Sequence, residues 1–155
     1  MKHLKSFCIA MAMLATLSLV SCNKDDDKVS KNIDAKYIFG TWEEEYPETV
    51  AGALDRVSLY SFSPTSADYK SGGFGIETTY VFGIMGGKKE ISTGTYTLGN
   101  DGLLQTFITD ENGEQQLFKK FQVKNISQDK MVLDALGDYD KPYPTMQMKL
   151  RTDIN

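Results

Sequence analysis

Three consecutive carboxylates, Glu43-Glu44-Glu45, are the residues of this chain whose type and spacing come closest to catalysis. Two carboxyl groups roughly 5–10 Å apart can hydrolyse a glycosidic bond, one acting as acid and the other as base or nucleophile. In an extended strand Glu43 and Glu45 share one face, while Glu44 points to the other face with Trp42. The alternative interpretation is a solvated strand end, since charged side chains mostly face water.

The acidic segment Asp110-Glu111-Asn112-Gly113-Glu114 is the other candidate for chemistry, as a Ca²⁺ loop. It lacks the alternating Asp or Asn ligands and the distal Glu of the known calcium loop. Asn and Gly accept the positive φ that tight hairpin turns require. The segment is therefore predicted to be a hairpin turn, and we expect no metal site.

The first 22 residues carry the features of a cleaved export signal. Lys2 and Lys5 precede Phe7–Val20, a run of 14 residues without a charge. A membrane-spanning helix needs roughly 20 apolar residues, so this run fits the core of a signal peptide better. It closes with Leu19-Val20-Ser21-Cys22, which resembles the lipobox of bacterial lipoproteins. The resemblance implies a signal peptide over residues 1–21 and lipidation of Cys22; the alternative is an ordinary secretory signal.

Cleavage before Cys22 would remove His3, the single histidine, together with Cys8. A Ser-His-Asp triad, a Cys-His pair, a His-ligated metal site and a disulfide would then lack their residues. Removal of Lys2 and Lys5 also leaves 15 of the 17 basic side chains against 21 acidic ones, which disfavours nucleic acid as a partner. We expect a protein that is not an enzyme and uses no cofactor.

The polar residues after Cys22, Asn23-Lys24-Asp25-Asp26-Asp27-Lys28, resemble the acidic run that directs Bacteroidetes lipoproteins to the cell surface. The resemblance implies an outer-membrane lipoprotein facing the cell exterior, with the periplasmic face as the alternative. Residues 22–36 are then the lipidated cysteine and a flexible acidic tether. Residues 37–155 remain for the folded domain.

From Tyr37 onward apolar and polar residues alternate between short turn segments, which predicts strands. Short connections make consecutive strands antiparallel neighbours, and eight of them can close into an up-and-down barrel. A two-sheet β-sandwich is the alternative all-β fold. The eight predicted strands are Tyr37–Tyr46, Arg56–Phe62, Glu77–Ile84, Lys89–Leu98, Leu103–Asp110, Gln115–Ile126, Lys130–Leu136 and Thr145–Thr152.

The same alternation predicts which side chains face the interior. We expect each strand to turn its more apolar face inward: Ile38 and Trp42; Val57 and Leu59; Tyr80, Phe82 and Ile84; Tyr96 and Leu98; Leu104 and Ile108; Leu117, Phe121 and Val123; Met131 and Leu133; Met146, Met148 and Leu150. An eight-stranded barrel is either filled by its side chains or holds one small ligand. The candidate cavity lining consists of Tyr80, Phe82, Tyr96, Phe121, Met146 and Met148.

Gly40-Thr41-Trp42 in the first predicted strand resembles the Gly-x-Trp opening of the lipocalins. With Gly94-Thr95-Tyr96 and Lys130-Met131-Val132-Leu133 the chain is similar to the lipocalin-like lipoproteins of Bacteroidetes. The resemblance implies a barrel that binds a small hydrophobic or amphipathic ligand. It also implies that Arg151 packs across Trp42 as a cation–π pair, closing the barrel floor.

Long loops are the basis of an alternative function. Tyr69–Gly75 mixes glycine with aromatic residues between two predicted strands, and Tyr69 and Phe74 are the candidate contact residues there. Rim loops at residues 47–56, 63–76 and 137–144 would bind an outer-membrane protein or inhibit a protease. A glycosidase built on Glu43-Glu44-Glu45 is the third interpretation.

Overall fold

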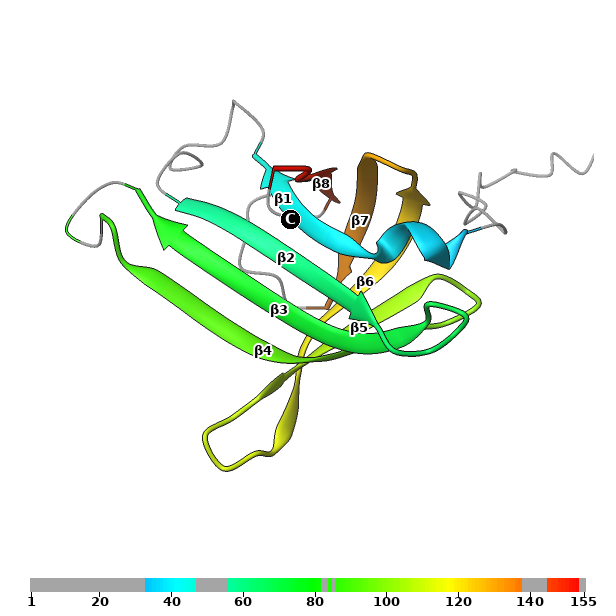
Figure 1. Cartoon of the computed structure of the whole chain (residues 1–155), viewed down its shortest axis with the longest axis horizontal. Helices are drawn as coiled ribbons and strands as arrows, with labels where there is room; N and C mark the ends of the chain where they lie inside the picture. The colour runs from blue at the N-terminus through cyan, green and yellow to red at the C-terminus, as the bar shows by residue number, and fades with distance from the viewer. Residues whose placement is uncertain (1–32, 47–55, 82–83, 85, 138–144, 154–155) are drawn as a thin grey trace, which may run out of the picture.

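The computed structural model describes residues 33–46, 56–81, 84, 86–137 and 145–153. These residues form one 3-10 turn and eight strands: η1 (Ala35–Ile38), β1 (Gly40–Glu45), β2 (Arg56–Pro64), β3 (Ser71–Tyr80), β4 (Lys89–Leu98), β5 (Leu103–Thr109), β6 (Gln115–Ile126), β7 (Lys130–Leu136) and β8 (Thr145–Leu150). Every strand pairs antiparallel with the next, and β8 pairs with β1, so the sheet closes into a barrel (Figure 1). The predicted eight-stranded up-and-down barrel is confirmed, and the two-sheet sandwich is excluded.

The hairpin turns form where the sequence places Gly, Asn and Asp. Gly102 and Gly113 have φ of 80° and 83°, which side chains disfavour. Asp101 Oδ1 accepts a hydrogen bond from the Leu103 amide at 3.1 Å, and Asp110 Oδ1 accepts one from the Glu114 amide at 2.9 Å. The acidic segment 110–114 is thus a turn, as predicted, and the structure adds that its own Asp110 holds it.

The up-and-down topology gives the barrel two ends with different contents. The end where β1 begins also carries the turns after β2, β4 and β6, and η1 covers it; we call it the capped end. Ile38 of η1 is fully buried, and its carbonyl accepts a hydrogen bond from Trp42 Nε1 at 3.0 Å. Opposite is the distal end, where β1 ends and β2 begins.

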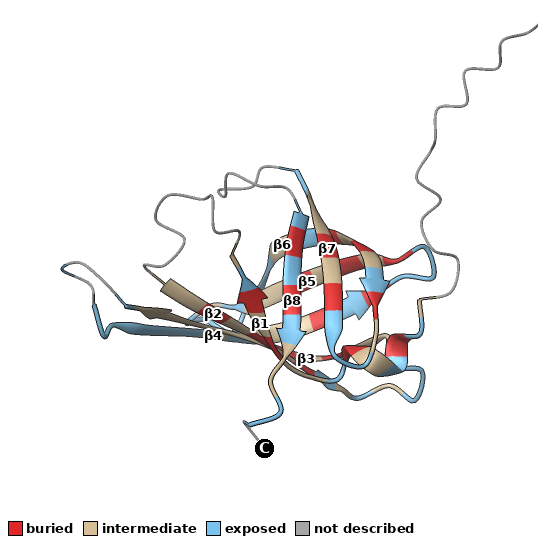
Figure 2. Ribbon diagram, turned by 90° about the horizontal axis from the view of Figure 1, so that it is seen from above, coloured by how far each residue is buried: buried red, intermediate tan, exposed pale blue. Residues whose placement is uncertain are grey.

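The core fills the barrel from the capped end. Met131 and Leu133 of β7 and Met146 and Met148 of β8 are buried and alternate with more exposed residues, so the two strands show alternating bands in Figure 2. Burial of these apolar side chains is the main favourable contribution to folding. The fully or almost fully buried apolar side chains are Ile38, Trp42, Phe62, Tyr96, Leu104, Phe121, Val123, Met131, Leu133, Met146 and Met148.

Two predictions for the first strands are wrong. Residues 35–38 form a 3-10 turn with Asp34 as its N-cap, so the strand predicted from Tyr37 begins at Gly40. On β2 the inward residues are Ser58, Tyr60 and Phe62, not Val57 and Leu59. The reason is the register, because Trp42 lies opposite Tyr60 and a buried Trp42 turns Tyr60 inward as well.

The glycine-rich segment predicted as a loop is the first half of β3. Gly72, Gly73 and Phe74 all pair with β2, and the connection is only residues 65–70. A Cβ on Gly72 would lie 2.2 Å from the Ser63 carbonyl oxygen, so only glycine lets the strands approach this closely. The prediction failed because glycine marks both mobile loops and close backbone contacts.

Several predicted inward side chains lie outside because strands end or shift register. β3 ends at Tyr80, so Ile84 falls in the connection to β4 and is completely exposed. The β5–β6 register shifts between Thr106 and Phe107, and Leu117, which lies opposite Phe107, is 47% exposed. Such a bulge adds one residue to a strand and reverses the facing of the residues beyond it.

The three rim loops do not all lie at one end of the barrel. β1 and β7 both run toward the distal end, so the segments 47–56 and 137–144 connect strands there. The connection after β2 lies at the capped end instead. Of these two distal segments the structure describes only Arg56 and Gly137; residues 47–55 and 138–144 lie outside the described residues.

Candidate functional site

The inner face of β1 and β2 becomes polar toward the distal end. Glu44 follows Trp42 inward along β1 and is only 3% exposed. The Tyr60 phenol donates a hydrogen bond to Glu44 Oε2 at 3.4 Å, and the hydroxyls of Tyr46 and Ser58 share a hydrogen bond at 3.0 Å. We call Glu44, Tyr46, Ser58 and Tyr60 the inner polar cluster.

The inner polar cluster holds the Tyr46 phenol protonated. Burial, followed by the negative charge of Glu44, raises the pKa of Tyr46 to about 12, although the hydrogen bond with Ser58 and the nearby Arg56 act in the opposite direction. Near neutral pH this phenol is a hydrogen-bond donor and not a base or nucleophile. The arrangement suits recognition of a polar group.

A chain of aromatic rings runs along the inner face beside this cluster. The Phe62 ring meets Tyr96 edge-on, with centroids 5.3 Å apart, and lies 5.5 Å from Phe74. Phe74 in turn lies 6.4 Å from Tyr60 and 6.2 Å from Phe118. Rings at these separations attract each other beyond the area that they bury. The barrel therefore contains a buried aromatic cluster.

Four of the candidate lining residues belong to the solid core. Tyr96, Met146 and Met148 are 0% exposed and Phe121 is 1% exposed, which leaves no water-sized space against these side chains. The Tyr96 hydroxyl donates to the Tyr69 carbonyl at 2.9 Å, and burial, followed by the charge of Asp68, raises the pKa of Tyr96 to about 12. These residues support the barrel wall.

The other candidate residues lie apart from one another. Tyr80 is half-buried at the distal end of β3 and donates to Glu90 Oε2 at 3.3 Å. Phe82 lies outside the described residues. Tyr69 is partly exposed in the β2–β3 connection, with a positive φ of 62°, whereas Phe74 is buried in β3 and not in a loop.

The partly buried residues at the margin of the core were not among the candidate lining residues. Ile76, Ile108, Phe118 and Ala135 pack against the core from β3, β5, β6 and β7.

The prediction that Glu43-Glu44-Glu45 is simply a solvated strand end is wrong for Glu44. The position of Glu44 two residues after Trp42 indicated its burial in the sequence, since residues two apart in a strand share a face and Trp42 faces inward.

The predicted stacking of Arg151 on Trp42 is wrong. The Arg151 amide bonds to the Thr41 carbonyl, so Arg151 lies opposite Thr41 and shares its outward facing. Its guanidinium donates to Glu43 Oε2 at 2.6 Å and to Asp153 at 2.7 and 2.5 Å. Trp42 points inward and meets Ile38, so the two side chains lie on opposite faces of the sheet.

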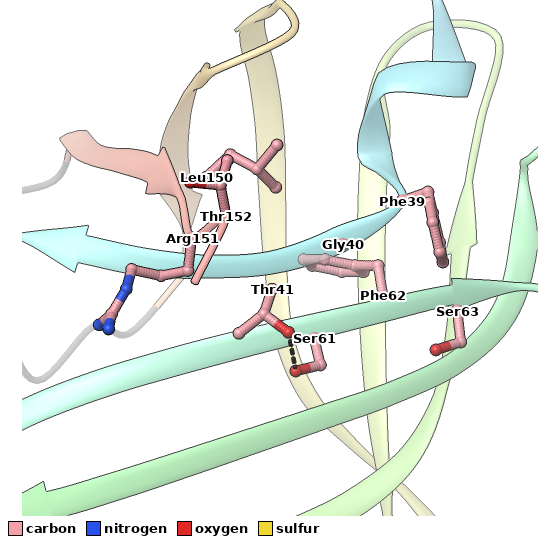
Figure 3. A pocket seen from close by; sticks show the side chains of 9 residues that line it. All are labelled: Phe39, Gly40, Thr41, Ser61, Phe62, Ser63, Leu150, Arg151 and Thr152. Atoms are coloured by element: carbon pink, nitrogen blue, oxygen red, sulfur yellow. Dashed lines mark hydrogen bonds between the residues drawn. The ribbon is translucent and has the colours of Figure 1, made fainter. Parts of the chain in front are cut away.

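The outer surface carries a pocket of about 350 Å³ near the capped end. Figure 3 shows its wall: Phe39 and Ser63 at one side, Arg151 at the other, and the side chains of Thr41 and Ser61 between them. Thr41 Oγ1 and Ser61 Oγ share a hydrogen bond at 3.1 Å. These residues come from the outward faces of β1 and β2 and from the segments that flank β1 and β8.

Within the described part of the chain, no group of three His, Cys, Asp or Glu side chains is placed to hold a metal ion. The same described residues contain no helix that is long and apolar enough to cross a membrane. No protein-family model, no curated protein and no solved structure matches this chain. What the structure shows is an eight-stranded antiparallel closed barrel, and no family is identified for the chain.

Proposed function

We propose that this protein is a non-catalytic binding barrel that takes a small amphipathic molecule into its distal end. The observation that carries the proposal is the graded inner face of the barrel. Toward the capped end it carries the buried rings of Phe62 and Tyr96, whereas Ile76 and Phe118 are only partly buried and Ile76 pairs with Tyr60 of the inner polar cluster. Binding sites for small molecules combine mostly apolar walls with a few placed polar groups.

The β4 strand offers a route to this region. β4 pairs with β5 only from Gly94 onward, while Lys89–Thr93 pair with β3. In Figure 1 the β4 and β5 ribbons diverge toward the distal end. Because Lys89–Thr93 have no backbone pairing with β5, β4 can move away from β5 at the distal end with fewer hydrogen bonds broken than at the capped end.

The proposal includes the lipid anchor at Cys22 and the outer membrane as its location, facing the cell exterior in preference to the periplasm. The described chain starts at the capped end: a Cβ on Gly102, in the β4–β5 turn, would lie 2.4 Å from Ile33 Cδ1. Eleven residues from Cys22 to Ile33 span at most about 36–40 Å. The distal end would then point away from the bilayer and take its ligand from the aqueous side.

Ligand extraction tests the binding function. The full chain and a Glu44→Gln/Phe118→Ala variant are purified alike, extracted with organic solvent and analysed by mass spectrometry. We expect a discrete molecule from the wild type and little from the variant, with Glu45→Gln/Leu117→Ala, the exposed neighbours of the two substituted residues, as the matched control. A wild type that yields nothing and also binds neither palmitate, cholate nor haem would contradict the proposal.

Metabolic labelling with a fatty acid tests the anchor separately. Label on the wild type and none on Cys22→Ser supports it, and equal labelling of both proteins contradicts it. Protease treatment of intact cells then separates the two membrane faces, because only a surface-exposed barrel is degraded.

A second candidate function is binding of a protein partner. Val81, Ile84 and Ile91 are apolar, exposed and close together in sequence around the β3–β4 connection. Exposed apolar groups of this kind mark interaction surfaces when they are contiguous. Loss of a co-purifying protein in Val81→Ser/Ile91→Ser, with ligand extraction unchanged, favours this function; retention of that protein argues against it.

A further inference from the structure

The outer pocket near the capped end is separate from the barrel interior, because the wall of β1 and β2 stands between them. Thr41, Ser61 and Ser63 of its lining face outward, as their positions beside the inward Trp42 and Tyr60 require, whereas Phe62 and Leu150 belong to the inward-facing set of β2 and β8. A volume of about 350 Å³ lies at the small end of the range of ligand sites, about 300–1,000 Å³. Space for one small molecule is therefore present on this surface.

The wall of the pocket combines an apolar plate with uncharged hydroxyls. Phe39 is 62% exposed, although the neighbouring Ile38 is fully buried. Across the floor stand the hydroxyls of Thr41, Ser61 and Ser63, each able to donate and to accept a hydrogen bond. Ser61 and Ser63 are two residues apart on one strand face, about 7 Å. A ring with an apolar face and hydroxyls at its edge would match both features.

The charge of the pocket excludes anions as its preferred ligands. Arg151 is the one cation among the lining residues, and its guanidinium is bound by both Glu43 and Asp153. One positive and two negative charges leave this group with an excess of negative charge. The guanidinium is held in place with N–H groups still available, so it can donate to a neutral oxygen without attracting a carboxylate or phosphate.

The shape of the pocket depends on Gly40. Its φ is +128°, and a Cβ there would lie 2.7 Å from Leu150 Cδ1. Glycine thus lets the chain turn between Phe39 and Thr41 and keeps Leu150 at the side of the pocket. The backbone at Gly40 therefore sets where Phe39 lies relative to the hydroxyl-bearing residues of β1 and β2.

We propose that this outer pocket is a binding site for an uncharged saccharide unit, with Phe39 under the apolar face of the sugar ring and the hydroxyls of Thr41, Ser61 and Ser63, with Arg151, at its edge. The site is independent of the ligand in the barrel interior. Affinity is expected near 1 mM for a single sugar, about 4 kcal/mol of binding free energy, because the pocket is shallow and exposed. Repetition along a polysaccharide would raise the effective affinity.

Saturation-transfer difference NMR tests this site directly. The full chain, held in a zwitterionic detergent that carries no sugar, is titrated with glucose, galactose, N-acetylglucosamine and maltose. We expect transfer to at least one of them, and a Kd raised about tenfold by Phe39→Ala and several-fold by Ser63→Ala. Ile91→Ala, an exposed apolar residue outside the pocket, is expected to leave the Kd unchanged.

Glucuronate provides the test of charge. It should bind more weakly than glucose to the wild type, and the difference should shrink in Glu43→Gln. Transfer to none of the four sugars, a Kd that Phe39→Ala does not change, or a preference for glucuronate would each overturn the proposal. Because Phe39 and Ser63 are exposed, loss of folding in these variants is not expected, and circular dichroism verifies this.

Discussion

Glu44 on β1 and Tyr60 on β2 face each other inside the barrel, with the phenol donating to the carboxylate at 3.4 Å. Both residues are almost fully buried, at 3% and 5% exposure, between the aromatic cluster and the distal end. A carboxylate in such a place is retained only with hydrogen-bond partners, because a buried charge without them is costly. The pair marks where the core ends and a polar interior begins.

Replacing Glu44 by alanine should lower the free energy of unfolding by about 1–3 kcal/mol, because Tyr60 loses a buried acceptor. Urea denaturation followed by circular dichroism measures the change. Glu45 is the matched control, since it is the next residue of β1 but faces solvent. Its replacement by alanine should alter stability by less than about 0.5 kcal/mol. Equal effects at the two positions would refute the buried placement of Glu44.

Gly72→Ala should destabilise the barrel, whereas Gly73→Ala should be tolerated far better. The added methyl at residue 72 meets the Ser63 carbonyl oxygen at 2.2 Å, but at residue 73 its nearest neighbours are 3.8 Å away. Forcing backbone apart typically costs about 1–3 kcal/mol. Thermal unfolding of both variants compares them, and a similar melting temperature for the two would show that the strands are not so close at Gly72.

Asp153 should stabilise the protein in moderately acidic solution. The Arg151 guanidinium lowers the pKa of Asp153 from its ordinary value of 3.8 to about 2. Because the folded pKa is the lower one, this contribution is complete above about pH 4 and disappears as the pH falls through about 2. The melting temperature of Asp153→Asn should therefore approach that of the wild type as the pH falls from about 5 to about 2. A constant difference between the two proteins over this range would contradict the ion pair.

Tyr46 should make the fold sensitive to alkali. Its folded pKa of about 12 lies above the ordinary value of 10.0, so the neutral phenol is favoured by folding. This contribution is complete below about pH 10 and is lost as the pH rises toward about 12. Ultraviolet titration of tyrosinate should show one late-titrating group fewer in Tyr46→Phe. Titration of every tyrosine near its ordinary pKa of 10.0 in the folded protein would argue against burial of Tyr46.

Much of the barrel could be predicted from the sequence, for a reason that particular strands make plain. Along β7 and β8, Met131 and Leu133 or Met146 and Met148 alternate with less buried residues, and all four are buried as predicted. Alternation on a pleated strand leaves one possible inner face when only one face is apolar. Turn residues such as Gly102 and Gly113 then set the strand order, since short connections pair neighbours.

Where both faces of a strand are apolar, only the tertiary structure decided which face points into the barrel. On β2, Val57 and Leu59 compete with Tyr60 and Phe62, and pairing with the buried Trp42 selected the second set. Strand pairing also separated Arg151 from Trp42. Arg151 lies opposite Thr41, so it faces outward and pairs with Glu43, whereas Trp42 faces the core.

The candidate sites depended on the tertiary structure even more. Glu44 gained its partner from another strand, and the outer pocket joins Phe39, Ser61 and Arg151, which lie far apart in the sequence. Local alternation determines which way a side chain points along its own strand. It carries no information on which residues the closure of the barrel brings to the same place, and binding depends on that meeting.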